Sequence, residues 1–310
     1  MHILVTGGAG FIGSNITKYL LEQGHKVRVL DNLITGNKEN IKEFESNSNF
    51  EFMYGDITNL ENLRKALDGI NVVTHQAALG SVPRSIVDPL TSHNANVNGF
   101  LNLLIICKEK GIKRIVYASS SSVYGDNIIL PKIEDCIGKQ LSPYAITKYI
   151  DELYAKIFYE LYDLECIGLR YFNVFGPKQD PNGVYAAVIP KFINSLKSDI
   201  NPKINGDGSY SRDFTYVENV VQANYLALTT NNSKTYGEIF NIGSGGRITI
   251  LEMYNIIKKT IRSDLEPEFG SNRIGDIPHS NADITKAKEL LGYFPKISFE
   301  EGILKTIEYY

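Results

Sequence analysis

Short apolar runs alternate with longer segments of helical spacing through the first half of the chain. Apolar runs of four to seven residues that end at Gly, Asp or Asn predict buried strands, and the periodic segments between them predict helices. Strands are expected at 2–6, 26–30, 50–54, 72–75, 114–118 and 165–170. Strands that alternate with helices form parallel sheets, so the pattern predicts a doubly wound α/β fold.

Apolar residues that recur every three or four positions predict three helices in this half. The first lies between the first two strands, and its apolar face consists of Ile12, Ile16 and Leu20. Gly24 suits its end because glycine readily adopts the left-handed conformation of a helix terminus. Two longer helices are expected at 92–110 and 143–162, the second opening with a capping Ser142 and with Pro143.

The second half of the chain is interrupted by many prolines and glycines, which predict loops and short elements. Regular patterning returns at 214–228 and 239–242. Two further helices are expected, one capped by Asp283 and ending at Gly292, the other at 299–309.

These patterns divide the chain into a larger domain and a smaller mixed α/β lobe that covers the carboxyl edge of the sheet. The larger domain is expected to comprise residues 1–172 and about 214–243, and the smaller lobe residues 173–213 and 244–310.

Composition excludes several classes of protein. A formal net charge of −3 and a pI near 6.0 lack the positive excess of nucleic-acid or membrane-surface proteins. Met1 leads directly into an apolar strand, without a signal peptide or a membrane-spanning run. Cys107, Cys136 and Cys166 cannot all pair and lack zinc-type spacing, so we expect reduced thiols, no metal centre and a cytoplasmic location.

A glycine-rich loop joins the first strand to the first helix. Glycine allows a tight turn and close approach of a pyrophosphate to the backbone, and the N-terminus of the helix favours an anion. In this context the loop predicts a dinucleotide-binding domain of the Rossmann type. The loop residues expected to bind the cofactor are Gly7, Gly10, Phe11, Ile12 and Gly13.

Carboxylates follow the second and third strands. Asp31 is placed to bind the adenosine ribose, and it favours NAD over NADP because it would repel a 2′-phosphate. Asp56 either meets the adenine or is an ordinary loop carboxylate. The other cofactor contacts expected after these strands and the fourth are Asn32, Ile57, Gln76, Ala77 and Ala78.

Tyr144 and Lys148 lie one helical turn apart, on the same face of the helix expected at 143–162. A free phenol ionises near pH 10, and a nearby cation lowers that value by roughly 1–3 units. A phenol between a lysine and a positively charged cofactor is therefore suited to act as a base near neutral pH. Such pairs also occur on ordinary helix surfaces, and the glycine loop is what favours the catalytic interpretation here.

Four motifs occur in the order found in the extended short-chain dehydrogenase/reductases, which this chain resembles. They are the glycine loop, residues 75–78, residues 119–126, and Ser142-Pro143-Tyr144 followed by Lys148. Residues 170–177, 212–214 and 273–278 extend the resemblance to the nucleotide-sugar branch. Within it, residues 80–85 and 179–185 resemble the UDP-N-acetylglucosamine 4-epimerases (WbpP-like) of the UDP-glucose 4-epimerase group.

The resemblance implies catalytic roles for three side chains. Tyr144 would be the general base, and Lys148 would be its electrostatic partner and a ribose ligand of the cofactor. Ser120 would share the hydrogen bond to the sugar 4′-hydroxyl, with Ser121 as an alternative. The same resemblance implies cofactor contacts from Asn96 and, against the nicotinamide, from Tyr171.

Substrate ligands are implied in the same way. Asn173 would bind the diphosphate, Arg212 and Arg273 would clamp it or else form surface ion pairs, and Asp276 would hold the uridine ribose. Ser280 stands where glucose-specific relatives carry a bulky tyrosine, so it would leave room for an N-acetyl group. The remaining residues implied at the substrate site are Ser81, Val82, Arg84, Ser121, Ser122, Ala187, Val188, Lys203 and Asn205.

The function so implied is NAD-dependent epimerisation at C4 of UDP-N-acetylglucosamine, and of UDP-glucose as a further substrate, with NAD retained because no net redox occurs. Ser121 and Ser122 occupy the places where dehydrating relatives carry an Asp-Glu pair, which argues against dehydration. The helices at 92–110 and 143–162 resemble those that form a dimer interface in relatives. Two alternatives stay open: a different UDP-sugar such as a uronic acid, and a non-catalytic NAD or nucleotide-sugar sensor.

Overall fold

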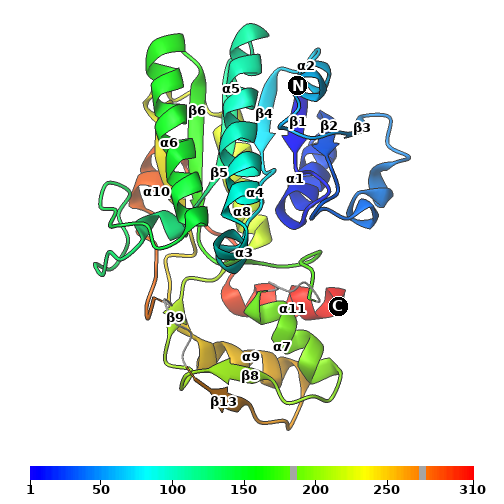
Figure 1. The fold of residues 1–310 in the computed structure, drawn as a ribbon. Coiled ribbons are helices and arrows are strands. Elements are labelled where there is room, and N and C mark those ends of the chain that lie inside the picture. The colour runs from blue at the N-terminus through cyan, green and yellow to red at the C-terminus, as the bar shows by residue number, and fades with distance from the viewer. Residues whose placement is uncertain (182–186, 272–276) are drawn as a thin grey trace.

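The computed structural model describes residues 1–181, 187–271 and 277–310. A seven-stranded parallel sheet forms its centre, in the order β11-β6-β5-β4-β1-β2-β3 (Figure 1). The strands are β1 (His2–Thr6), β2 (Lys26–Asp31), β3 (Phe50–Tyr54), β4 (Val72–His75), β5 (Arg114–Ser120), β6 (Glu165–Tyr171) and β11 (Ile239–Ile242). The predicted Rossmann-type α/β fold is confirmed, and β1 lies at the point where the strand order reverses. Ligands of such sheets bind at the carboxyl ends of the strands beside this point.

Helices cover both faces of the sheet because successive strand residues point to opposite faces. Ile3 and Val5 of β1 pack with α1 (Phe11–Glu22) and α8 (Val217–Thr229), whereas Leu4 packs toward the opposite layer. That opposite layer contains α2 (Leu60–Ala66), α5 (Gly99–Glu109) and α6 (Pro143–Tyr162), of which α5 and α6 stand side by side in Figure 1.

Where the sequence predicted one helix at 92–110, the structure has three successive helical segments. They are α4 (Pro89–His93), a π-helical turn (Asn94–Asn98) and α5. The π turn inserts one residue into the helical repeat, a feature that apolar periodicity does not reveal. The prediction of one regular helix was therefore wrong, while the helix at 143–162 was right to the residue.

One end of α10 differs from the sequence prediction, and the other agrees with it. The N-cap of α10 (Thr285–Leu291) is Ile284, and Asp283 instead accepts a hydrogen bond from the Thr285 N–H at 2.8 Å. Gly292 ends α10 in the left-handed conformation as predicted, with a φ of 68°.

A smaller lobe lies below the carboxyl edge of the sheet and has its own apolar core (Figure 1). Its helices are α7 (Val188–Lys197), α9 (Ile250–Ile261) and α11 (Phe299–Tyr309). Three two-stranded sheets complete it: β7 (Val174–Phe175) with β10 (Thr215–Tyr216), β8 (Lys203–Asn205) with β13 (Glu268–Gly270), and β9 (Ser211–Arg212) with β12 (Ile248–Thr249).

The Asp213 carboxylate holds the segments that join the lobe to the sheet. It is fully buried and accepts hydrogen bonds from the N–H groups of Ser244 at 2.7 Å, Gly245 at 3.1 Å and Ala282 at 3.2 Å. A buried carboxylate with this many charge-assisted partners is a strong local constraint. Asp213 therefore fixes the backbone after β11 and before α10.

The remaining elements are one short helix and four 3₁₀ turns. They are α3 (Val82–Val87), η1 (Lys38–Asn40), η2 (Lys42–Phe44), η4 (Ser121–Tyr124) and η5 (Ser233–Thr235). Within the described ranges, no helix combines the length and apolar character needed to cross a bilayer.

Candidate active site

A cavity of about 1060 Å³ opens at the carboxyl edge of the sheet, where the strand order reverses. Its walls come from the glycine loop, the ends of β2 and β3, the loop after β4, the start of α6, and segments of the lobe. Small-molecule sites typically enclose about 300–1,000 Å³, so this cavity has room for an extended ligand.

The glycine loop forms one wall by approaching the loop after β4 very closely. Gly7 has a φ of +69°, and a Cβ built on it would lie 2.6 Å from the Ala77 nitrogen. A Cβ on Gly13 would lie 2.2 Å from the Gly7 carbonyl oxygen. The α1 helix starts at Phe11 without a side-chain cap, so its first N–H groups lack that partner. The five loop residues predicted from the sequence all line the cavity: Gly7, Gly10, Phe11, Ile12 and Gly13.

Asp31 lies on the same wall, at the end of β2, and is held rigidly. Its carboxylate accepts hydrogen bonds from the N–H groups of Ala9 at 3.0 Å and Leu33 at 2.8 Å. Burial raises the pKa of Asp31, and these two bonds oppose that effect. The predicted ribose ligand thus also fixes the glycine loop to the loop after β2.

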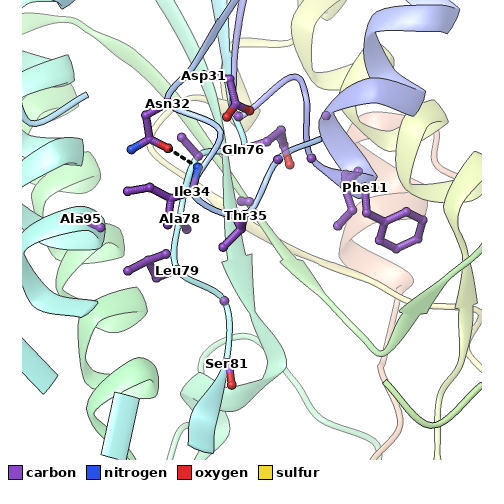
Figure 2. Close-up of a pocket in the computed structure, with 18 of the residues that line it drawn as sticks. Phe11, Asp31, Asn32, Ile34, Thr35, Gln76, Ala78, Leu79, Ser81 and Ala95 are labelled. Atoms are coloured by element: carbon purple, nitrogen blue, oxygen red, sulfur yellow. Dashed lines mark hydrogen bonds between the residues drawn. The ribbon is translucent and has the colours of Figure 1, made fainter. Parts of the chain in front are cut away.

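Asn32 and Asp56 bond to each other beside Asp31. Asn32 Nδ2 donates to Asp56 Oδ2 at 2.7 Å, and Asn32 Oδ1 accepts from the Ile34 N–H at 3.1 Å (Figure 2). Burial opposes ionisation of Asp56, but hydrogen bonds from Thr58 and Asn32 outweigh it and lower the pKa of Asp56. Asp56 and Ile57 both line the cavity.

Residues 76–81, in the loop after β4, form another part of the cavity wall (Figure 2). Tyr171 donates its hydroxyl proton to Gln76 Oε1 at 3.1 Å and accepts from Asn224 Nδ2 at 2.8 Å. Burial raises the pKa of the Tyr171 phenol, so it stays protonated at neutral pH. Gln76, Ala77, Ala78 and Tyr171 all line the cavity, where the sequence placed the cofactor.

Asn96 lies behind this wall and does not line the cavity. It is fully buried, accepts the Leu79 N–H at 2.8 Å and donates to Thr147 Oγ1 at 3.0 Å. Asn96 therefore fixes the position of Leu79, which does line the cavity. The residues of this segment that reach the cavity are Thr91, Asn94 and Ala95. Asn94 and Ala95 lie in the π turn, which sequence analysis did not detect.

Tyr144 and Lys148 line the cavity on the face of α6 that points toward it. Lys148 is 2% exposed, and its ammonium donates to the Ala118 carbonyl at 2.9 Å and to Asp151 Oδ2 at 3.2 Å. An ammonium has three protons, so one is available to a ligand. The Tyr144 N–H donates to Ser85 Oγ at 3.0 Å, which ties the start of α6 to α3.

The serine run lies at the end of β5 and in η4. Ser119 lines the cavity, but its hydroxyl donates to Glu152 Oε1 at 2.5 Å. Ser120 Oγ donates to Ser122 Oγ at 3.1 Å and accepts the Ser122 N–H at 3.1 Å. Ser120, Ser121 and Ser122 are half-buried and stand just beyond the cavity lining. The choice between Ser120 and Ser121 stays a prediction.

Part of the predicted substrate set reaches the cavity. Ser81 and Arg84 line it, and Ser81 Oγ caps α3 by accepting the Arg84 N–H at 3.2 Å. Ala187 lines it at the N-terminus of α7, whose first residue is Val188. Val82 is exposed at the start of α3.

Five other predicted substrate ligands lie in the lobe, away from the cavity lining: Asn173, Lys203, Asn205, Arg212 and Ser280. Arg212 donates to the carbonyls of Ser211 at 2.9 Å and Pro278 at 3.0 Å, and the Ser280 N–H donates to the Ser211 carbonyl at 3.1 Å. Arg212 and Ser280 are thus neighbours. Lys203 and Asn205 are exposed at the ends of β8, and Asn173 donates to the Asp213 carbonyl at 3.3 Å. Arg273 and Asp276 lie outside the described residues.

Three segments that the sequence did not single out as ligands also line the cavity. They are residues 34–37 with Asn40, residues 178–181, and the C-terminal pair Tyr309 and Tyr310. Tyr310 donates its hydroxyl proton to the Gln179 carbonyl, and Lys178 Nζ donates to the Asn40 carbonyl at 2.7 Å. These contacts join segments far apart in the chain, so local sequence carried no sign of them.

Comparison with known proteins identifies a family that matches this chain. Residues 3–243 match the model of the NAD dependent epimerase/dehydratase family. The chain is 38% identical over 317 residues to the UDP-glucose 4-epimerase of Mycolicibacterium smegmatis, with 100% of this chain and 98% of that protein covered.

Solved structures are similar over their whole length. A UDP-N-acetylglucosamine 4-epimerase from Methanobrevibacter ruminantium M1, in complex with UDP-N-acetylmuramic acid, superposes with a TM-score of 0.94 at 40% identity, covering 99% of this chain and 97% of that one. A UDP-glucuronic acid 4-epimerase from Bacillus cereus, with UDP-glucuronic acid and NAD, gives a TM-score of 0.93 at 33% identity, covering 100% and 98%.

The Gly13→Ala variant should lose affinity for the dinucleotide. The added Cβ would lie 2.2 Å from the Gly7 carbonyl, so the loop must shift. Overpacking of this kind costs about 1–3 kcal/mol, or roughly a five- to hundredfold weaker affinity. Dinucleotide binding can be measured by calorimetry on protein stripped of cofactor. Gly246→Ala is the control, because its Cβ would meet only Ser244 Oγ at 3.5 Å. Equal dinucleotide affinities in the two variants would refute the role of the glycine loop in binding.

Proposed function

Because this chain belongs to the NAD dependent epimerase/dehydratase family, we propose that it is a UDP-sugar 4-epimerase that converts UDP-N-acetylglucosamine to UDP-N-acetylgalactosamine. The observation that carries the proposal is the placement of Tyr144 and the Lys148 ammonium together on the wall of the cavity. The similarity to 4-epimerases over the full length of the chain supports the reaction type.

The residues present fit NAD. A Cβ on Gly7 or Gly13 would collide with neighbouring backbone. The first residues of α1 line the cavity and lack a side-chain cap, which suits binding of a pyrophosphate. Asp31 offers a carboxylate for the adenosine ribose, and Asn32 and Asp56 lie beside it. When bound, NAD would supply the acceptor, and afterwards the donor, of the hydride at the sugar C4.

Side chains of the protein would transfer the proton of the sugar 4′-hydroxyl. Tyr144 takes the proton of the 4′-hydroxyl as C4 is oxidised and returns it as the 4-keto sugar is reduced from its other face. Lys148 stabilises the phenolate through its positive charge. Ser120 donates to or accepts from the same hydroxyl. Since C4 loses and regains one hydride and one proton, there is no net redox change, and we expect NAD to be retained.

Substrate preference is assigned to Ser280. This residue is small and half-buried, and it neighbours Arg212, which together with Arg273 we propose as a diphosphate ligand. We further propose that Asn173, Asp276, Lys203, Asn205, Ala187 and Val188 complete the nucleotide site. The N-acetyl preference is supported by the 40% identical UDP-N-acetylglucosamine 4-epimerase. A uronic acid remains the second candidate sugar because a UDP-glucuronic acid 4-epimerase is also similar over its whole length.

Tyr144→Phe should lower the rate of epimerisation by about 10²–10⁴-fold, the usual contribution of a general base. The phenol oxygen forms no hydrogen bond within the described structure, so folding and NAD content should be unchanged. The assay incubates the variant with UDP-N-acetylglucosamine and separates the products by chromatography. A rate near that of the wild type would remove Tyr144 as the base.

Ser280→Tyr should abolish turnover of UDP-N-acetylglucosamine and spare that of UDP-galactose. A tyrosine at this position would fill the space that the 2-N-acetyl group needs, whereas a 2-hydroxyl is smaller. Rates with both sugars, and with UDP-glucuronic acid, are compared at equal concentrations. The same loss on both hexoses would reject Ser280 as the specificity residue.

We also propose that α4, α5 and α6 pair with those of a second copy. They expose large apolar side chains that would favour burial: Leu90 is 73% exposed, Leu153 51% and Leu161 64%. Ile146 and Ile157 extend the α6 stripe at helical spacing.

Ile157→Glu should convert a dimer into a monomer, because it places a charge in the middle of this stripe. Sedimentation analysis gives the mass in solution. Ile128→Glu is the matched control, since Ile128 is 91% exposed on a loop outside the stripe. A wild-type monomer, or a dimer that survives Ile157→Glu, would contradict this interface.

A further inference from the structure

A buried carboxylate, Asp151, lies next to Lys148 on the side away from Tyr144. Its Oδ2 accepts from the Lys148 ammonium at 3.2 Å, and the two side chains are 1% and 3% exposed. Its Oδ1 is also buried and has no hydrogen-bond partner. A buried carboxylate with one oxygen unsatisfied lowers stability, so packing alone gives no reason for an acid here.

The position of Asp151 controls where the Lys148 ammonium lies. Of the three ammonium protons, one is bonded to the Ala118 carbonyl and one to Asp151. The third is left for the cavity, which Lys148 lines together with Tyr144. The carboxylate also carries a negative charge close to the ammonium, and in a buried site such a charge is weakly screened. The field that Lys148 exerts on the phenol therefore depends on the charge of Asp151.

Several other charged and titratable groups pack around the pair. Glu152 on α6 is bonded to Arg170 on β6 through both its oxygens, each at 2.8 Å. His75 on β4 is neutral, because burial and then Lys148 lower its pKa to about 3. Burial raises the pKa of Tyr117 on β5 and of Cys166 on β6, so both stay protonated.

Asp151 differs from these neighbours. Burial raises its pKa to about 7, while the opposing attraction of Lys148 is insufficient to cancel that effect. Asp151 is thus a described group beside Lys148, in addition to the proposed base Tyr144, that is placed to change its charge near neutral pH.

We propose that Asp151 is a positioning residue for the epimerase reaction: its ion pair fixes the Lys148 ammonium, and its charge partly offsets the field of that ammonium at Tyr144. This inference rests on the proposed role of Tyr144 as the base. Protonated Asp151 leaves the ammonium unopposed and favours the phenolate, whereas ionised Asp151 weakens it. The two groups therefore titrate as a coupled pair, and the ionisation of the phenol is spread over a wider pH range than that of one independent group.

The test is the Asp151→Asn variant, which keeps an oxygen for Lys148 and removes the charge. Its matched control is Glu160→Gln, which removes a charge from an exposed position on the same helix. Tyrosinate absorbance in the near ultraviolet is titrated in NAD-loaded protein between about pH 5 and 9, with Tyr144→Phe as the blank so that only Tyr144 contributes. The acidic limb of the kcat/KM profile is measured in parallel.

Wild type and Glu160→Gln should give the same broad titration. Asp151→Asn should give a single-proton curve whose midpoint lies about half a pH unit or more below that of the wild type. The acidic limb of its kcat/KM profile should shift to lower pH by the same amount. An unchanged midpoint and shape in Asp151→Asn would overturn the inference. A purely structural role would lower kcat at every pH and leave the limb in place, which would also overturn it.

Two outcomes separate this inference from the proposed function. If Tyr144→Phe stays active, the base itself is wrong. If Tyr144→Phe is inactive and the Asp151→Asn titration matches wild type, only the role of Asp151 fails. Should Asp151→Asn not fold, the wild-type curve decides: a broad curve supports the coupled pair, and a single-proton curve refutes it.

Discussion

The buried ammonium of Lys148 holds the start of α6 against the end of β5, and the proposed chemistry depends on that attachment. Lys148 bonds to the Ala118 carbonyl on β5, and four residues later Glu152 accepts the Ser119 hydroxyl on the same strand. Tyr144 is on α6 and the serine run begins on β5, so their relative position depends on this register. A displacement of α6 by a fraction of a turn would separate the proposed base from the proposed hydroxyl partner.

The dinucleotide side of the cavity is built by a second constraint, the contact between the glycine loop and the loop after β4. Gly7 and Ala77 follow the two adjacent strands on either side of the switch point, and their backbones meet without any side chain between them. Asp31 reinforces the arrangement from β2 by bonding to Ala9. The same carboxylate that we expect to bind a ribose therefore also holds the loop that would bind the pyrophosphate.

The buried pair of Lys148 and Asp151 contributes little to the stability of the fold, although we propose that it matters for the reaction. Burying an ion pair, with one carboxylate oxygen left without a partner, gives little net stabilisation. The neighbouring ion pair of Glu152 and Arg170 has hydrogen bonds to both carboxylate oxygens and joins α6 to β6. The contrast between the two neighbouring acids on α6 is what distinguishes Asp151 as a group with a functional effect.

The sequence by itself determined the parallel sheet, the glycine loop and the helical face shared by Tyr144 and Lys148, because each depends on residues close together in the chain. Strand periodicity and helix capping are local properties, and the bounds of α6 and α11 were predicted to the residue. Only the tertiary structure decided that Asn96 lies behind the cavity wall, that Ser119 bonds to Glu152, and that Tyr310 reaches the cavity. These positions depend on a π turn, on the register of a helix against a strand, and on packing between distant segments. The periodicity of apolar residues in the sequence reveals none of these features.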